Sequence, residues 1–268
     1  MTTLSIGGRA PHGRLPGGRL NQVLRVSGEL LITLGVIVFL FIAYELWFTG
    51  IYTQHAQSTL NHQLQTEWAQ PLPAGPPASS GSTSPGAISS ASPGLSPSSV
   101  PSASPSAPVA VVLPGNAIGI IRIPRLGDNY GFAIVEGVST DDLKKGPGHY
   151  PGSAMPGGIG NFVVSGHRTT YLAPFNGLGD VVVGDAIVIE TRDTYYTYRV
   201  TQTESVLPTD VGVVLPVPEK PRAKPTQALI TLTTCNPKYS ASHRLIVHGL
   251  LESALPKSAG LPPALKGA

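Results

Sequence analysis

The chain has a single cysteine, Cys235, at the end of the apolar run 228–234. Residues in this run alternate as they do in a β-strand, which places Ile230 and Leu232 on one face and threonines on the other. A turn begins at Asn236, so the thiol lies where the predicted strand ends. A strand end is rigid on one side and open on the other, which suits a nucleophile that attacks a substrate carbonyl. The thiol can instead be a small buried hydrophobe, and both interpretations stay open at this point.

Two further side chains have chemistry that can accompany a thiol. His167 follows the apolar stretch 161–165 and a glycine, so it enters a loop at a predicted strand end. An imidazole there can accept and donate protons toward a thiol from another strand, although His167 alone fits a surface or loop histidine better than a catalyst. Arg244 opens the next apolar segment, 244–251. No HExxH, CxxC or histidine-rich spacing is present, so we expect no metal ion and no other cofactor.

The segment 109–252 has the pattern of an all-β domain. Its apolar runs are short, rich in β-branched or aromatic residues, and separated by Gly, Pro and Asp. Many short strands with little helix predict a closed barrel or a sandwich. One helical turn is expected with Ser139 or Thr140 as its N-cap, followed by two aspartates and then two lysines. The predicted strands are 118–124, 132–136, 161–165, 186–191, 195–201, 229–234 and 245–251.

Residues 26–50 are predicted to form one transmembrane helix. The run from Leu30 to Tyr44 is uncharged, and Glu29 and Glu45 lie at its edges. The run is long for a signal peptide and no small-residue cleavage site follows it closely, so an uncleaved anchor is favoured over a cleaved leader. Four arginines precede the helix, and no Lys or Arg follows it before the β-rich domain. The N-terminus is therefore predicted to be cytoplasmic and the rest of the chain extracellular.

Composition separates the anchor from the folded domain. The stretch 71–108 is almost wholly Pro, Ser, Ala and Gly and has no charge, so we expect a disordered linker. Beyond the membrane, acidic and basic residues nearly balance, which indicates no nucleic-acid partner. The predicted parts are a basic cytoplasmic tail (1–25), the anchor (26–50), a juxtamembrane segment that can extend the helix (51–70), the linker (71–108), the folded domain (109–252) and a disordered tail (253–268).

Taken together, these motifs resemble the sortases, the cysteine transpeptidases of Gram-positive bacteria. The resemblance rests on Thr231-Leu-Thr-Thr-Cys235 with the downstream Arg244 and on Ser165-Gly-His167-Arg, and it extends across most of 117–251. Several segments look like class E, the housekeeping-type sortases of high-GC actinobacteria. These segments are 135–139, 145–152, 167–171 and 173–176.

The resemblance implies an eight-stranded sortase-type β-barrel with short helices. It also implies that His167, Cys235 and Arg244 meet at one end of a groove. Cys235 would be the nucleophile that forms an acyl thioester, and His167 would be the general acid and base. Arg244 would hold the substrate backbone and stabilise the oxyanion.

Two further residues are predicted to bind substrate. Tyr171 borders the expected groove, and a tyrosine there is associated in this class with preference for alanine over proline in the signal. Thr234 precedes the nucleophile and is expected to contribute to the oxyanion site. Tyr171 as a loop aromatic and Thr234 as a strand-face threonine are equally valid structural interpretations. Many relatives are expected to have a glycine after this tyrosine, where the present chain has Leu172.

The implied function is that of a membrane-anchored transpeptidase that cleaves a Leu-Ala-x-Thr-Gly-like signal between Thr and Gly. Its partners would be secreted proteins with such C-terminal signals, the membrane, and a peptidoglycan amine that accepts the protein. The protein would be a single-pass protein of the cell membrane with its catalytic domain outside. The alternatives are a pilin-polymerising sortase, a cysteine hydrolase, and a non-catalytic stalked adhesion or scaffold domain.

Overall fold

The computed structural model describes residues 17–70 and 115–267. The predicted linker 71–108 and the first part of the predicted basic tail lie outside the described residues. The chain divides into two compact units, Met1–Ile51 and Tyr52–Ala268. The first contains the apolar part of a long helix, and the second contains a β-barrel.

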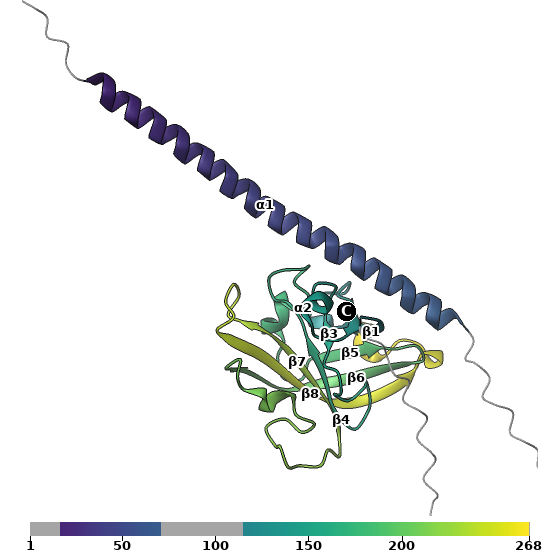
Figure 1. The fold of residues 1–268 in the computed structure, drawn as a ribbon. Helices are drawn as coiled ribbons and strands as arrows, with labels where there is room; N and C mark the ends of the chain where they lie inside the picture. The colour runs from purple at the N-terminus through teal and green to yellow at the C-terminus, as the bar shows by residue number, and fades with distance from the viewer. Residues whose placement is uncertain (1–16, 71–114, 268) are drawn as a thin grey trace, which may run out of the picture. The chain divides into compact units, whose positions relative to one another are not determined.

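Eight strands in the described residues form a closed barrel in the order β1-β2-β3-β4-β7-β8-β6-β5 (Figure 1). This arrangement confirms the prediction of an all-β, eight-stranded barrel. Two neighbouring pairs, β2 with β3 and β4 with β7, are parallel, and the other six are antiparallel. The strands are β1 (Ala117–Arg122), β2 (Phe132–Glu136), β3 (Gly148–His149), β4 (Gly160–Ser165), β5 (Ala186–Glu190), β6 (Thr194–Val206), β7 (Ala228–Asn236) and β8 (His243–Pro256).

Two short elements connect the longer strands. The strand β3 has only two residues and lies within the Gly- and Pro-rich stretch 145–152, so the hydrophobic pattern did not predict it. It pairs with β2 on one side and β4 on the other, which closes the barrel there. The predicted helical turn is confirmed as α2 (Thr140–Leu143). Ser139 is its N-cap and forms a reciprocal capping box with Asp142.

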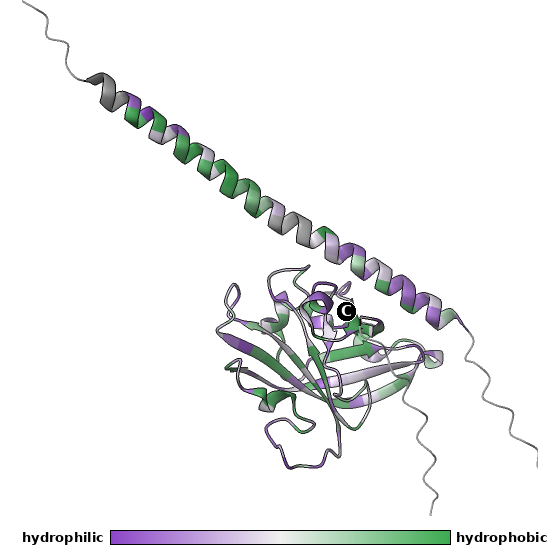
Figure 2. Cartoon of the chain, in the orientation of Figure 1, coloured by the Kyte–Doolittle hydropathy of each residue, from purple (hydrophilic) through white to green (hydrophobic). Residues whose placement is uncertain are grey.

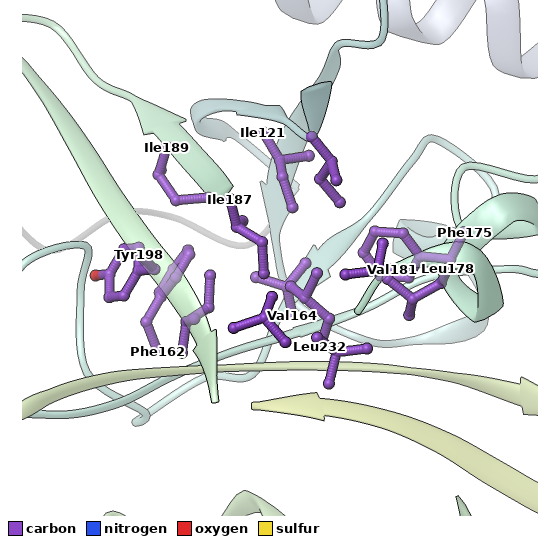
Figure 3. Close-up of a cluster of buried hydrophobic side chains, with 14 of the residues drawn as sticks. Ile121, Phe162, Val164, Phe175, Leu178, Val181, Ile187, Ile189, Tyr198 and Leu232 are labelled. Carbon is purple, nitrogen blue, oxygen red and sulfur yellow. The ribbon is translucent and has the colours of Figure 1, made fainter. Parts of the chain in front are cut away.

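Alternate side chains of the strands fill the barrel interior (Figure 3). Phe162 and Val164 point inward from β4, and Ile230 and Leu232 point inward from β7; all four are fully buried. The alternation predicted for 228–234 is therefore confirmed. Burial of each such side chain contributes about 1.5–3 kcal/mol, so the core holds firmly the two strands whose ends are discussed below.

The long helix α1 (Gly17–Ala69) precedes the barrel in sequence. Its segment Gln22–Tyr44 has a mean hydropathy of 2.4 and is long and apolar enough to cross a membrane. Figure 2 shows this stretch in green, followed by a mostly purple, hydrophilic end. Apolar side chains on this segment, such as Leu31 and Phe39, are exposed. A helix that is apolar all round has the pattern of a segment that contacts lipid.

The part of α1 after Tyr52 belongs to the same compact unit as the barrel. The buried amide of Gln57 donates to the carbonyl of Ala133 at 3.0 Å and to that of Lys145 at 2.8 Å, and it accepts from the N–H of Ala133 at 2.8 Å. An apolar cluster lies beside these bonds, made of Leu60, Leu64, Ala117, Ala133 and Val135. The segment predicted only as a helical extension of the anchor therefore also packs on the barrel.

The C-terminal residues continue the fold beyond the predicted domain end at residue 252. The strand β8 runs to Pro256 and is followed by the 3₁₀ turns η4 (Lys257–Ala259) and η5 (Pro263–Leu265). This differs from the disordered tail expected for 253–268, because β6 is long enough to pair with the last residues of β8. Lys257 Nζ lies 2.9 Å from Glu190 Oε1 and 3.6 Å from the ring centroid of Trp68, which joins the tail to β5 and to α1.

Candidate active site

The register of β7 and β8 places Cys235 directly opposite Arg244. Residues opposite each other in an antiparallel pair lie on one face, with Cβ atoms about 4.5–5.5 Å apart. One step back on this face, Thr233 lies opposite Ile246, and both are buried. Cys235 itself is half-buried and has no disulfide partner. On this face of the sheet, burial therefore decreases from Thr233 to Cys235, and the thiol is reachable from solvent.

His167 reaches the same level of the barrel from the neighbouring strand. β4 runs parallel to β7 with Ser165 opposite Thr233, and the N–H of Gly166 donates to the carbonyl of Thr233 at 3.1 Å. His167 follows the end of β4 by two residues, and Cys235 lies two residues beyond Thr233 near the end of β7. Parallel pairing thus brings the chain at His167 and the chain at Cys235 to the same end of the barrel, although the two residues are far apart in sequence.

Thr234 joins these two strands. It is buried, and its Oγ1 donates to the carbonyl of Gly166 at 2.7 Å. The bond ties the strand that ends at Cys235 to the backbone that leads into His167. Because the hydroxyl proton is used in this bond, a hydrogen bond from Thr234 to an oxyanion would have to come from its main-chain N–H. That contact stays a prediction.

The imidazole of His167 lies in a partly buried position under an aromatic ring. Its ring centroid is 4.9 Å from that of Tyr171, with the planes tilted by 37°. Among the described residues, no group hydrogen-bonds its buried Nε2 atom. Burial lowers the pKa of His167 below its ordinary value, because removal from water disfavours the charged form. The structure thus favours a neutral His167 imidazole at neutral pH.

The loop that carries Tyr171 has an unusual backbone. Tyr171, Leu172 and Ala173 have φ values of 52°, 59° and 45°, so three consecutive residues other than glycine are left-handed. Each such residue costs on the order of 1 kcal/mol and persists only where its surroundings hold it. The N–H of Phe175 donates to the carbonyl of His167 at 3.0 Å, and this phenylalanine is fully buried. Leu172 occupies the position where a glycine is expected in many relatives, and a glycine would relieve the strain.

The side chain of Arg244 points toward its own loop. Its Nη1 donates to the carbonyls of Ala241 and His243, at 3.0 Å in each case. The main chain of Arg244 is therefore opposite Cys235, whereas the guanidinium is bound to the turn between β7 and β8. These two bonds use only Nη1, so the donors of Nη2 and Nε are not taken up by them.

A second arginine, which sequence reasoning did not single out, lies against the nucleophile. Arg168 Nη1 donates to the carbonyl of Cys235 at 3.1 Å and to Asn236 Oδ1 at 2.5 Å. The side chain is 9% exposed. The available signal was its place directly after His167 in Ser-Gly-His-Arg, but nothing in the sequence shows that it reaches back to Cys235.

Comparison with known proteins identifies the family of the barrel. Residues 121–252, which contain His167, Cys235 and Arg244, match the sortase domain family. Sortase SrtE2 of Streptomyces coelicolor is 34% identical over 249 residues, covering 89% of this chain and 85% of that protein. The chain belongs to the sortase family. The closed barrel is thus a sortase barrel, with the three predicted site residues at one of its ends.

Two further relatives place this sortase near class E. Sortase SrtE1 of Streptomyces coelicolor is 32% identical over 265 residues, which cover 96% of this chain and 65% of the relative's length. The structure of sortase E from Streptomyces avermitilis has 41% identity and a TM-score of 0.53, and the match covers 57% of this chain and 99% of that one. These matches confirm the predicted class E resemblance. The present chain spans just under two thirds of SrtE1.

Proposed function

We propose that this sortase is a membrane-anchored cysteine transpeptidase that cleaves a Leu-Ala-x-Thr-Gly-like signal between Thr and Gly. The observation that supports the proposal most strongly is the strand register that puts Cys235, His167 and Arg244 at one end of the barrel. The resemblance to class E supports the choice of signal. The acceptor is then an amine of the cell-wall peptidoglycan.

The proposed chemistry has two acyl-transfer steps. The sulfur of Cys235 attacks the threonine carbonyl carbon, a C–S bond forms, and the C–N bond to glycine breaks while His167 protonates the departing amine. The incoming amine then attacks the thioester, His167 takes its proton, and the new amide forms as the thiol is released. Arg244 carries a permanent charge that stabilises the oxyanion in both steps.

The protonation state of His167 limits the reactive fraction. Among the described residues, no carboxylate pairs with this imidazole, and burial lowers its pKa. At neutral pH this imidazole is mainly neutral. The imidazolium that protonates the leaving amine is then a minority, so the proposal predicts modest turnover.

The location in the cell is part of the proposal. The apolar segment Gln22–Tyr44 would be the anchor, with the arginine-rich N-terminal side in the cytoplasm. The barrel would then be extracellular, where the secreted substrates and the peptidoglycan amine are found. Tyr171 would contribute to recognition of the signal through the face of its ring that does not contact His167.

The test is incubation of the full-length protein in detergent micelles with a Leu-Ala-x-Thr-Gly peptide and triglycine, followed by mass spectrometry. We expect a thioester adduct on Cys235 and a new product in which the threonine is joined to triglycine. Cys235→Ala is expected to form neither. Cleavage without ligation would indicate a hydrolase, and preference for a lysine side-chain amine over triglycine would favour the pilin-polymerising alternative. Absence of any adduct would support a scaffold.

A further inference from the structure

We propose that Arg168 is a positioning residue for the nucleophile. It holds the main chain of Cys235 in one orientation and places a permanent positive charge beside the point where negative charge develops during acylation. This inference rests on the proposed function. It concerns a residue outside the expected set of Cys235, His167 and Arg244.

The contacts of Arg168 define the first part of this role. One nitrogen, Nη1, bonds both the carbonyl of Cys235 and the side-chain oxygen of Asn236, at 3.1 and 2.5 Å. The chain leaves the barrel surface at these two residues, because β7 ends at Asn236. A rigid guanidinium that bonds both residues restricts rotation of the backbone on which the thiol is mounted. A near-attack geometry for the thiol depends on that restriction.

Burial without a counter-charge defines the second part. Arg168 is 9% exposed, its Nε has no hydrogen-bond partner among the described residues, and no carboxylate of the described chain pairs with it. Three other arginines of the barrel have acidic partners: Arg122 with Glu190, Arg125 with Asp185, and Arg199 with Glu252. Burial of a charge without a counter-charge is unfavourable, because the charge loses its hydration. The guanidinium of Arg168 would find a counter-charge only during acylation, when negative charge develops near Cys235.

The surrounding loop is shaped around the guanidinium. A Cβ atom at Gly179 would lie 2.9 Å from Nη2 of Arg168, so a larger residue there would push the guanidinium from its present position. Asn176 Nδ2 donates to the carbonyl of Arg168 at 2.9 Å, and Lys238 Nζ donates to Asn176 Oδ1 at 2.9 Å. These contacts come from the turn η2 (Asn176–Asp180) and from the segment after β7. Arg168 is therefore fixed by both segments that flank the candidate site.

The two arginines near Cys235 have different surroundings and hence different roles. Arg244 lies at the open face and donates to carbonyls of its own loop, from which it can move to a substrate. Arg168 is buried and already donates to the nucleophile's own residue. Arg244 would act on the substrate, whereas Arg168 acts through Cys235.

The first experiment compares three substitutions in the full-length protein in micelles. Arg168→Lys keeps the charge, Arg168→Gln keeps a neutral donor, and Arg168→Met keeps neither. With the Leu-Ala-x-Thr-Gly peptide, we expect acylation to fall about 10- to 100-fold in the Met variant, with KM changed less than about twofold. The Lys and Gln variants should lie between. Arg199→Gln, which removes an exposed pair on β6, is the matched control and should acylate normally.

The second experiment needs no signal peptide. It tests directly whether the positive charge of Arg168 acts at the thiol of Cys235. Cys235 is the only cysteine, so alkylation reports on this position alone. We compare its rates with iodoacetate, which is an anion, and with iodoacetamide, which is neutral. Arg168→Gln should lower the iodoacetate-to-iodoacetamide ratio roughly threefold or more, because a nearby positive charge attracts the anion. Arg168→Lys and Arg199→Gln should leave the ratio near that of the wild type.

The outcomes separate the inference from the proposed function. An unchanged ratio in Arg168→Gln, or a loss of acylation that only matches a loss of folded protein, overturns the role of Arg168. If the wild type acylates no signal peptide but the ratio still depends on Arg168, the proposed function fails while the charge beside Cys235 stands. A lowered ratio together with slower acylation at constant KM supports both.

Discussion

The side chain of Gln57 hydrogen-bonds both main-chain groups of Ala133, accepting from its N–H at 2.8 Å and donating to its carbonyl at 3.0 Å. At Ala133 the carboxamide thus makes the main-chain hydrogen bonds that a neighbouring strand would make. It covers the edge of β2 that pairs with β3 only from Val135 onward. The helix end after Tyr52 is therefore part of the folded unit of the barrel.

Gln57→Ala should lower the free energy of unfolding by about 1–3 kcal/mol, because it leaves two buried main-chain groups without partners. Urea denaturation of the full chain measures this loss. Gln63→Ala is the control on the same helix, since Gln63 bonds only the exposed Glu67 one turn away. Its effect should stay below about 0.5 kcal/mol. Equal losses in the two variants would show that the Gln57 contact contributes little.

The pKa of His167 should depend on Tyr171. Burial lowers this pKa from its ordinary 6.5, so the unfolded chain binds the proton at higher pH than the folded chain. The stability that the neutral imidazole supplies is complete above the ordinary value and is lost as the pH falls from that value through the lowered pKa of the folded chain. Tyr171→Ala admits water, which should raise the pKa of His167 and move the acid limb of activity upward. An NMR titration of the imidazole measures the shift.

Tyr239→Ala is the control for this titration, because Tyr239 is 90% exposed. The pKa of His167 should not change in that variant. If Tyr171→Ala also leaves the pKa in place, the barrel and not the ring covers the imidazole.

Leu172→Gly should stabilise the protein by about 0.5–1 kcal/mol. Leu172 has a φ of 59°, a conformation that glycine adopts without strain, and its side chain is largely exposed. The reverse change, Gly184→Ala, places a Cβ where φ is 93° and no atom lies within 4 Å, so it should destabilise by a similar amount through the backbone alone. Thermal denaturation of both variants tests the pair. A loss of stability in Leu172→Gly would mean that the leucine side chain outweighs the strain.

Arg244→Lys should be impaired almost as strongly as Arg244→Ala. A guanidinium can make two parallel contacts to substrate carbonyls, whereas lysine offers a single point charge. Loss of such a donor typically lowers the rate on the order of a hundred-fold or more. A quenched-fluorescent Leu-Ala-x-Thr-Gly peptide measures acylation in each variant. Near-normal rates for the lysine variant would show that positive charge suffices.

The sequence was sufficient where a local pattern carries the information. Alternation predicted β7 with Cys235 near its end, and the capping residues predicted the turn at Thr140. The barrel and its class followed from the resemblance to the sortases, which the family match and the relatives confirm. The strand β3 could not be predicted, because two residues in a Gly- and Pro-rich stretch have no hydrophobic period and form a strand only through their neighbours.

Contacts between distant segments were the part that the sequence did not show. Arg168 was visible only as a neighbour of His167, and its contact with Cys235 depends on the parallel pairing of β4 with β7. The polar residues after 252 suggested a solvated tail, whereas their pairing depends on the length of β6. In the same way, Gln57 resembled any polar residue on a helix surface until the fold placed it against Ala133.

The contact between Gln57 and Ala133 also bears on the order of folding. The two residues are 76 positions apart, so docking of the helix closes a long chain loop at an entropic cost of roughly 4 kcal/mol. The main core of the barrel does not include the helix, whose end packs instead on the smaller cluster with Ala117, Ala133 and Val135. The barrel should therefore form first and the helix end should dock afterwards. Detachment of that helix end is then the first local opening of the native protein, well before the strands that hold Cys235 separate.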